Sequence, residues 1–113
     1  MTRDALLYLN DIFESIEKIL QYTANLTFKE FAANSMVIDA VIRNFEIIGE
    51  AASRIPDDIL SAYPEVPWFE MKGMRNIMAH EYFRVDLKIV WVTIRQSLPA
   101  LLPVINRIIA ERQ

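Results

Sequence analysis

The chain has 113 residues, 53% of them hydrophobic, contains no cysteine and carries a formal net charge of −3. This length fits one domain, residues 1–113, that can bury its own core, and the lack of cysteine excludes disulfide frameworks, thiolate zinc sites and cysteine nucleophiles. The acidic balance argues mildly against nucleic-acid binding. The N-terminus is rich in acids and no unbroken apolar run is long enough to span a membrane, so we expect a soluble, cytoplasmic protein.

The charge is unevenly distributed along the chain. Residues 1–71 contain five basic and twelve acidic residues, whereas residues 72–113 contain seven basic and three acidic ones. Basic side chains of the second part could form a modest phosphate-binding patch, although Lys72, Lys88 and Arg95 could equally be ordinary solvated helix residues. The candidate residues of the patch are Lys72, Arg75, Arg84, Lys88 and Arg95. The high apolar content also predicts that some apolar surface is buried between subunits.

The first half of the chain predicts two helices. Residues 3–22 have the pattern of an amphipathic helix, with apolar residues on one face and acids elsewhere, and we interpret this helix as scaffold. Thr27 and Glu30 have the spacing of a capping box. They predict a second helix that bends near Asn34 and continues to about Arg54.

Four charged residues of the second helix recur at steps of four, three and four, which places them in one stripe about 60° wide. They are Asp39, Arg43, Glu46 and Glu50. The residues around them are apolar or small, so we predict a central helix whose stripe faces a cleft or a partner. The alternative is a ladder of ion pairs along the helix, each contributing about 0.3 kcal/mol. Asn44 lies on the opposite side and should be a hydrogen-bonded buried amide.

Prolines divide the second half of the chain into further predicted helices. Pro56 ends the long helix or starts a short one over 57–62, and another helix begins at Trp68, which we expect to pack in the core. Two apolar helices follow over 86–98 and 99–110, kinked or divided by prolines. No strand alternation appears, so the predicted fold is an all-α bundle of four or five helices.

The segment 68–84, WFEMKGMRNIMAHEYFR, contains the only histidine of the chain, His80. Five helical steps carry His80 roughly 140° around the axis from Arg75, so an unbroken helix would point the two side chains apart. The helix is therefore predicted to end near His80, and an irregular end can turn His80 and Tyr82 toward Arg75. A second copy of the chain could instead supply the missing partner.

Arg75 and His80 together suit metal-independent RNA cleavage. A lone histidine often caps a helix C-terminus, where the helix dipole favours a cation. His80 is also the side chain here that exchanges protons near neutral pH, and Arg75 offers a planar cation suited to phosphate. The reaction needs a base for the ribose 2′-OH and an acid for the leaving 5′-oxygen. Because one histidine cannot easily do both, we favour a homodimer with a composite cleft.

Metal catalysis has little support in the sequence. One histidine and scattered carboxylates do not form a compact ligand set, and no glycine-rich phosphate loop is present. We therefore expect neither a metal nor a cofactor.

The spacing Arg75-x4-His80-x-Tyr82, with Asn76 after the arginine, resembles the signature of the HEPN superfamily. The surrounding text, VPWFEMKGMRNIMAHEYFRVD, and the upstream text, DAVIRNFEIIGEAA, resemble the HepT-like toxins of bacterial toxin–antitoxin pairs, and the similarity extends over nearly the whole chain. The resemblance implies a HEPN-type bundle with a ribonuclease site between paired protomers, acting on tRNA or mRNA. In that site Arg75 would stabilise the phosphorane, Asn76 would orient it and His80 would exchange protons.

The resemblance also implies a role for Tyr82. In HepT-like proteins this tyrosine is the target of the cognate antitoxin, a minimal nucleotidyltransferase that adds AMP and blocks RNA access. The residues alone leave Tyr82 free to contact the phosphate, stack a base or pack beside Arg75. Lys72 is a further candidate for the phosphate, and Glu81 either orients His80 or is an exposed acid at the helix end.

Two readings compete with the enzyme. One is a non-catalytic helical partner that binds a nucleotidyltransferase or a nucleotide, which the acidic net charge suits slightly better. The other is an ordinary helical interaction domain. The simultaneous presence of Arg75, Asn76, His80 and Tyr82 favours the enzyme, because a binding module does not need all four.

Overall fold

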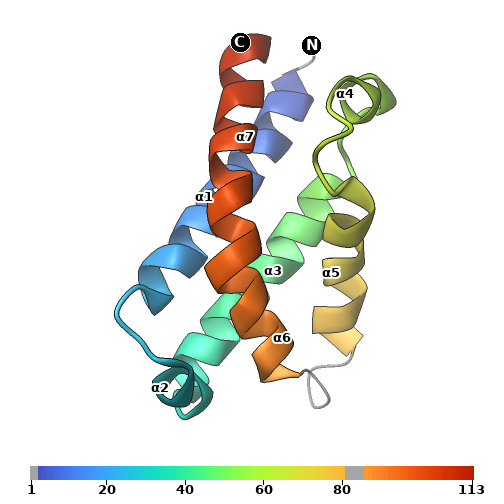
Figure 1. Cartoon of the computed structure of the whole chain (residues 1–113). Coiled ribbons are helices and arrows are strands. Elements are labelled where there is room, and N and C mark those ends of the chain that lie inside the picture. The colour runs from blue at the N-terminus through green and yellow to red at the C-terminus, as the bar shows by residue number, and fades with distance from the viewer. Residues whose placement is uncertain (1–2, 81–85) are drawn as a thin grey trace.

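The computed structural model describes the backbone of residues 3–80 and 86–113 and the side chains of residues 4–75 and 86–113. Every secondary-structure element within these residues is helical, which confirms the all-α prediction (Figure 1). The elements are α1 (Arg3–Thr23), α2 (Phe28–Ala32), α3 (Ser35–Ala52), α4 (Asp57–Ala62), α5 (Trp68–His80), α6 (Leu87–Val92), the π-helical turn η2 (Thr93–Ser97) and α7 (Leu98–Arg112).

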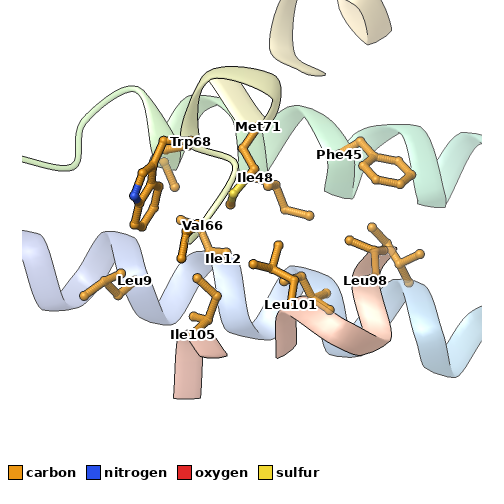
Figure 2. Close-up of a cluster of buried hydrophobic side chains, with 14 of the residues drawn as sticks. Leu9, Ile12, Phe45, Ile48, Val66, Trp68, Met71, Leu98, Leu101 and Ile105 are labelled. Atoms are coloured by element: carbon orange, nitrogen blue, oxygen red, sulfur yellow. The ribbon is translucent and has the colours of Figure 1, made fainter. Parts of the chain in front are cut away.

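The bundle is built from α1, α3, α5 and the continuous run α6–η2–α7, while α2 and α4 are short connecting helices (Figure 1). Helix α3 is central because it packs against both α1 and α5, and α7 packs along α1. Figure 2 shows the apolar contact among these helices, which places side chains of all four in one core. They include Leu9, Ile12, Phe45, Ile48, Trp68, Met71, Leu98, Leu101 and Ile105.

The predicted second helix is in fact two helices. The capping box that opens α2 is confirmed, since Glu30 N donates to Thr27 Oγ1 at 3.2 Å and Thr27 N donates to Glu30 Oε1 at 2.9 Å. The prediction of one helix with a bend was wrong at Asn34. Its side chain accepts from Val37 N at 3.1 Å and caps a new helix, so α2 ends and α3 begins there.

Two predicted buried polar side chains lie in the core. Trp68 is buried and its indole N–H donates to Tyr63 O at 3.0 Å, as expected for a packing residue. Asn44 is also buried, and its Nδ2 donates to Ala40 O at 2.9 Å. Its Oδ1 has no hydrogen-bond partner among the described residues. The predicted hydrogen-bonded amide is therefore confirmed for its nitrogen only.

The two predicted C-terminal helices form one run. Proline lacks an N–H, so Pro99 cannot donate to the carbonyl four residues earlier, and its ring crowds that carbonyl. The backbone accommodates this with η2, in which Leu98 N–H donates to Thr93 O, five residues back. Pro103 lies inside α7. The prolines therefore change the hydrogen-bond register without separating α6 from α7.

The run Leu87–Arg112 is the one described helix that is long and apolar enough to cross a membrane by length and composition. The expectation that no segment spans a membrane was based on the absence of a long unbroken apolar stretch. The run Leu87–Arg112 contains polar residues, but its mean hydropathy is high enough for a membrane-spanning helix. One such helix is weak evidence for a membrane span. Its core-facing side is buried in the bundle through Val90, Ile94, Leu98, Leu101, Ile105, Ile108 and Ile109, so we describe it as a bundle helix.

Arg95 joins the C-terminal run to the end of α1. Its Nη2 donates to Thr23 O at 2.5 Å and to Leu26 O at 2.8 Å, and its guanidinium carbon lies 4.2 Å from the centre of the Trp91 ring. Thr23 is the last residue of α1, where a cation is favoured, and Leu26 lies in the connection that follows. Arg95 is exposed, as the interpretation of a solvated helix residue holds, and it also binds these two carbonyls, which the sequence did not indicate. Its place in a phosphate-binding patch stays a prediction.

An Arg95→Ala variant is expected to lose about 1–2 kcal/mol of unfolding free energy, because it removes the hydrogen bonds to Thr23 O and Leu26 O and the cation–π contact with Trp91. Thr23 O keeps its hydrogen bond from Leu26 N, so the main loss is at Leu26 O. Urea denaturation followed by circular dichroism would measure this loss. Lys88→Ala, at an exposed position of α6, is the matched control and should stay within about 0.5 kcal/mol of the wild type. Equal midpoints for both variants would contradict the capping role.

Candidate functional site

The candidate site is built where α3 and α5 approach most closely. A Cβ atom added to Gly49 on α3 would lie 2.4 Å from Arg75 N, 2.8 Å from Arg75 Cβ and 2.9 Å from Arg75 Cα. Real Cβ contacts are almost never shorter than 3.0 Å, so only glycine permits this approach. The backbone of Arg75 is thus held directly against α3.

The guanidinium of Arg75 is fixed on one side by two groups of α3. Its Nη1 donates to Glu50 Oε2 at 3.1 Å and to Ser53 Oγ at 3.4 Å. The other oxygen of the same carboxylate, Oε1, accepts from Arg54 Nε at 3.2 Å and forms an ion pair with Arg54 Nη2 at 3.1 Å. Glu50 therefore bridges two guanidinium groups. The Arg75 side chain is still 43% exposed, so part of it remains accessible to a ligand.

Arg75 opens onto a pocket of about 250 Å³ between α1 and α3, which we call the Arg75 pocket. Its lining residues are Tyr8 and Asp11 from α1, Arg43, Glu46, Ile47, Glu50, Ala51 and Arg54 from α3, and Arg75 from α5. Three of the four residues of the predicted charged stripe are among them. Asp39 is not one of the described residues that line the pocket.

The ion-pair alternative for the stripe is present in the same structure. Arg43 Nη1 lies 3.6 Å from Glu46 Oε2, on the exposed side of α3. This distance is long and the Arg43 side chain is 70% exposed, so the pair contributes little to stability. Lining a pocket and pairing along the helix are thus compatible roles for Arg43 and Glu46.

The remaining predicted site residues lie on α5 or follow it. Lys72 is half-buried, three residues before Arg75, and does not line the Arg75 pocket. The structure describes the backbone of α5 up to His80, so Asn76 and His80 are placed on this helix, but their side chains lie outside the described residues. Glu81 and Tyr82 lie outside them altogether. Their predicted roles stay predictions.

Sequence reasoning missed the apolar lining residues Ile47 and Ala51 and three polar residues of the pocket. Arg54 follows Glu50 by four positions, and that spacing is the signal from which its pairing could have been found. Tyr8 and Asp11 belong to the helix that was interpreted as scaffold, and only the packing of α1 on α3 brings them to the pocket. Within the described part of the chain, no group of three or more His, Cys, Asp or Glu side chains could hold a metal ion.

The pKa of Glu50 lies below its ordinary value, mainly because its carboxylate accepts a hydrogen bond from Arg75 and, to a smaller extent, because it accepts one from Arg54. Because the pKa of Glu50 is lower in the folded state, its ionised carboxylate stabilises the fold at pH values above the ordinary pKa. This stabilisation is lost as the pH falls through the folded-state pKa.

Between about pH 5 and pH 3, the urea midpoint of the wild type should therefore fall more steeply than that of Glu50→Gln. Glu14→Gln, at an exposed position of α1, should keep the wild-type slope, and identical slopes for all three proteins would contradict the pairing.

An all-α bundle in which the helix of an Arg-x4-His motif is held against a central helix defines a HEPN-type protein. The chain belongs to the HepT-like ribonuclease family, because the family model described as "Ribonuclease HepT-like" matches residues 12–108. This membership confirms the resemblance that the sequence motif indicated.

Proteins of similar sequence carry ribonuclease names, in agreement with this family. The chain is 44% identical over 94 residues to the "Probable ribonuclease HepT" of Thermococcus cleftensis, covering 83% of this chain and 86% of that protein. It is 40% identical over 99 residues to the "Putative RNase MJ1380" of Methanocaldococcus jannaschii, covering 88% of this chain and 91% of the relative. It is also 35% identical over 94 residues to the "Putative RNase TTE0752" of Caldanaerobacter subterraneus, covering 83% and 84%. No solved structure gives a significant match.

Proposed function

We propose that this protein is a metal-independent endoribonuclease that acts as the toxin of a toxin–antitoxin pair, with Arg75 and His80 as its catalytic residues. Membership of a ribonuclease family supports the reaction class. The observation that carries the proposal is the Arg75 geometry, in which one side of the guanidinium is fixed by Glu50 and Ser53 while 43% of the side chain stays exposed beside a pocket. A preorganised cation of this kind stabilises charge that develops on a phosphate in the transition state.

The proposed reaction is an internal transesterification. A base removes the proton from the ribose 2′-OH, the 2′-oxygen attacks the adjacent phosphorus, and the bond from phosphorus to the 5′-oxygen breaks as an acid protonates that oxygen. The products are a 2′,3′-cyclic phosphate and a 5′-hydroxyl. Arg75 balances the additional negative charge of the phosphorane, Asn76 orients it, and Lys72 contributes a further cation on the same helix.

A homodimer supplies the second proton-transfer group. In the proposed composite cleft, one His80 acts as the base and the His80 of the other protomer acts as the acid. Two large exposed apolar side chains, on the motif helix α5 and on α6 after it, support an interface with a second copy of the chain. Phe69 on α5 is 84% exposed and Ile89 on α6 is 67% exposed. Burial of such side chains against a second copy would remove them from water.

The proposed regulation acts at Tyr82. A cognate minimal nucleotidyltransferase adds AMP to this tyrosine, and the added charge and bulk exclude RNA from the cleft. Glu81 is proposed to orient His80. The proposed substrates are tRNA or mRNA, and the proposed place of action is the cytoplasm. No cofactor has a part in the proposed reaction.

Controlled expression in bacterial cells tests this function. The wild type should arrest growth and fragment cellular RNA, whereas Arg75→Ala should do neither at an equal protein level. Co-expression of the cognate nucleotidyltransferase should restore growth, and mass spectrometry should find AMP on Tyr82. Growth that is unaffected by unmodified wild-type protein, with intact RNA, would overturn the toxin proposal.

The rival function is a non-catalytic partner that binds a nucleotidyltransferase or a nucleotide. The net charge of −3 and the pairing of Arg75 with Glu50 favour it, because both weaken attraction to a polyanion. This rival predicts that the wild-type protein leaves RNA intact. It also predicts that a variant in which Arg75 and His80 are both replaced by alanine still binds the nucleotidyltransferase.

A further inference from the structure

The formal charges of the described residues that line the Arg75 pocket cancel. Three arginines, Arg43, Arg54 and Arg75, face three acids, Asp11, Glu46 and Glu50. A cleft that attracts only phosphate groups carries an excess of cations, because each phosphate brings a negative charge. A lining whose described charges balance, and which offers both donors and acceptors, suits a neutral polar group instead.

The lining and the volume of the Arg75 pocket suit an aromatic heterocycle. Ile47 and Ala51 give it an apolar part, and Tyr8 contributes a half-buried aromatic side chain. Its volume of about 250 Å³ is large enough for one nucleobase. Single-stranded RNA is recognised in this manner, with unstacked bases laid against aromatic or guanidinium planes and hydrogen-bonded along their edges.

The carboxylates of the pocket differ in their availability. Glu50 already accepts from Arg75 and Arg54, and Glu46 faces Arg43 at 3.6 Å. Within the described part of the chain, the carboxylate of Asp11 has no hydrogen bond or ion pair, and the residue is exposed. An ionised carboxylate can accept two parallel hydrogen bonds. Guanine is the RNA base whose Watson–Crick edge presents two adjacent donors, N1–H and the N2 amino group, to such a carboxylate.

We propose that the Arg75 pocket is a base-recognition subsite that holds an unstacked guanine of the RNA substrate beside the phosphate bound by Arg75. Asp11 accepts from N1–H and N2–H of the guanine, Arg43 turns from its long contact with Glu46 to donate to O6 and N7, and Tyr8 contacts the face of the base. This inference rests on the proposed ribonuclease function and adds its sequence preference.

Sequencing of both product ends from a randomised RNA pool tests the subsite. The wild type should show guanine enriched at one fixed position within about two nucleotides of the cleaved bond. Asp11→Asn should lower that enrichment about tenfold, because an amide cannot accept both hydrogen bonds. The matched control is Asp4→Asn, an exposed acid on the same helix outside the pocket, which should keep the wild-type enrichment.

Inosine provides a second test at the level of single atoms, because it lacks the N2 amino group of guanosine. Replacing the preferred guanosine by inosine should slow cleavage by the wild type about tenfold and should slow cleavage by Asp11→Asn much less. Cleavage without any guanine preference, or a preference that Asp11→Asn leaves intact, would overturn the subsite while leaving the ribonuclease proposal in place.

Direct binding separates failure of the subsite from failure of the proposed function. If the wild type cleaves no RNA, isothermal titration with GMP, AMP, CMP and UMP still tests the Arg75 pocket. The subsite predicts that GMP binds at least about tenfold tighter than the other three and that Asp11→Asn removes this difference. Equal affinities for all four nucleotides would overturn the inference on their own.

Discussion

A Gly49→Ala variant is expected to lose about 3 kcal/mol of unfolding free energy and most of its ribonuclease activity. The new Cβ would stand 2.4 Å from the backbone nitrogen of Arg75, so α5 must shift away from α3. Overpacking of this kind costs about 1–3 kcal/mol and sometimes more. The shift also moves the Arg75 guanidinium away from Glu50 and Ser53, which fix it. Urea denaturation and RNA cleavage would measure the two losses.

Gly73 provides the matched control on the same helix pair. A Cβ added there meets no described atom within 4 Å. Because glycine in a helix interior is less favourable than alanine, Gly73→Ala should raise the unfolding free energy by about 0.5–1 kcal/mol and keep its activity. If Gly49→Ala were as stable as the wild type, α3 and α5 would not approach as closely as the structure places them.

Replacing Arg75 is expected to have the largest effect on catalysis. Arg75→Ala should lower kcat for RNA cleavage by at least about 100-fold, since it removes the cation that stabilises the phosphorane. Its unfolding free energy should change by less than about 1 kcal/mol, because the ion pair with Glu50 is partly exposed. Arg75→Lys should lose at least about tenfold in kcat, since an ammonium lacks the fork that holds Glu50 and a phosphate together.

Arg107 is the control for this change. It forms an ion pair with Glu65 at 2.6 Å, away from the Arg75 pocket, so Arg107→Lys removes a guanidinium without touching the site. This variant should cleave RNA at the wild-type rate. A kcat for Arg75→Lys close to that of the wild type would show that charge alone suffices and that the fixed fork has no catalytic role.

The helices and core could be predicted because periodicity along one helix is local information. The apolar faces of residues 3–22 and of the C-terminal segment correspond to the buried sides of α1 and α6–η2–α7. The division at Asn34 was missed because a capping side chain and a bend have similar sequence signals. The role of Arg95 depends on where α1 ends relative to Trp91, which spacing along one helix does not reveal.

The candidate site also divides into features that local spacing predicts and features that depend on tertiary packing. The spacing of Arg43, Glu46 and Glu50 predicted one charged edge, and these residues do line one pocket with Arg75. The part played by Gly49 depends on the distance between two helices, which composition does not encode. Asp11 became visible only through the packing of α1 on α3. Residues brought together by tertiary packing are thus the ones that sequence patterns miss.

Cleavage of total cellular RNA by the purified protein in EDTA, beside Arg75→Ala and His80→Ala, tests the central claim most directly. The protein should first be confirmed free of AMP on Tyr82 by mass spectrometry. The ribonuclease account predicts fragments with 2′,3′-cyclic phosphate or 3′-phosphate ends from the wild type, and their loss in both folded variants. Intact RNA with folded, unmodified, dimeric wild-type protein, or cleavage that survives in both variants, would contradict it.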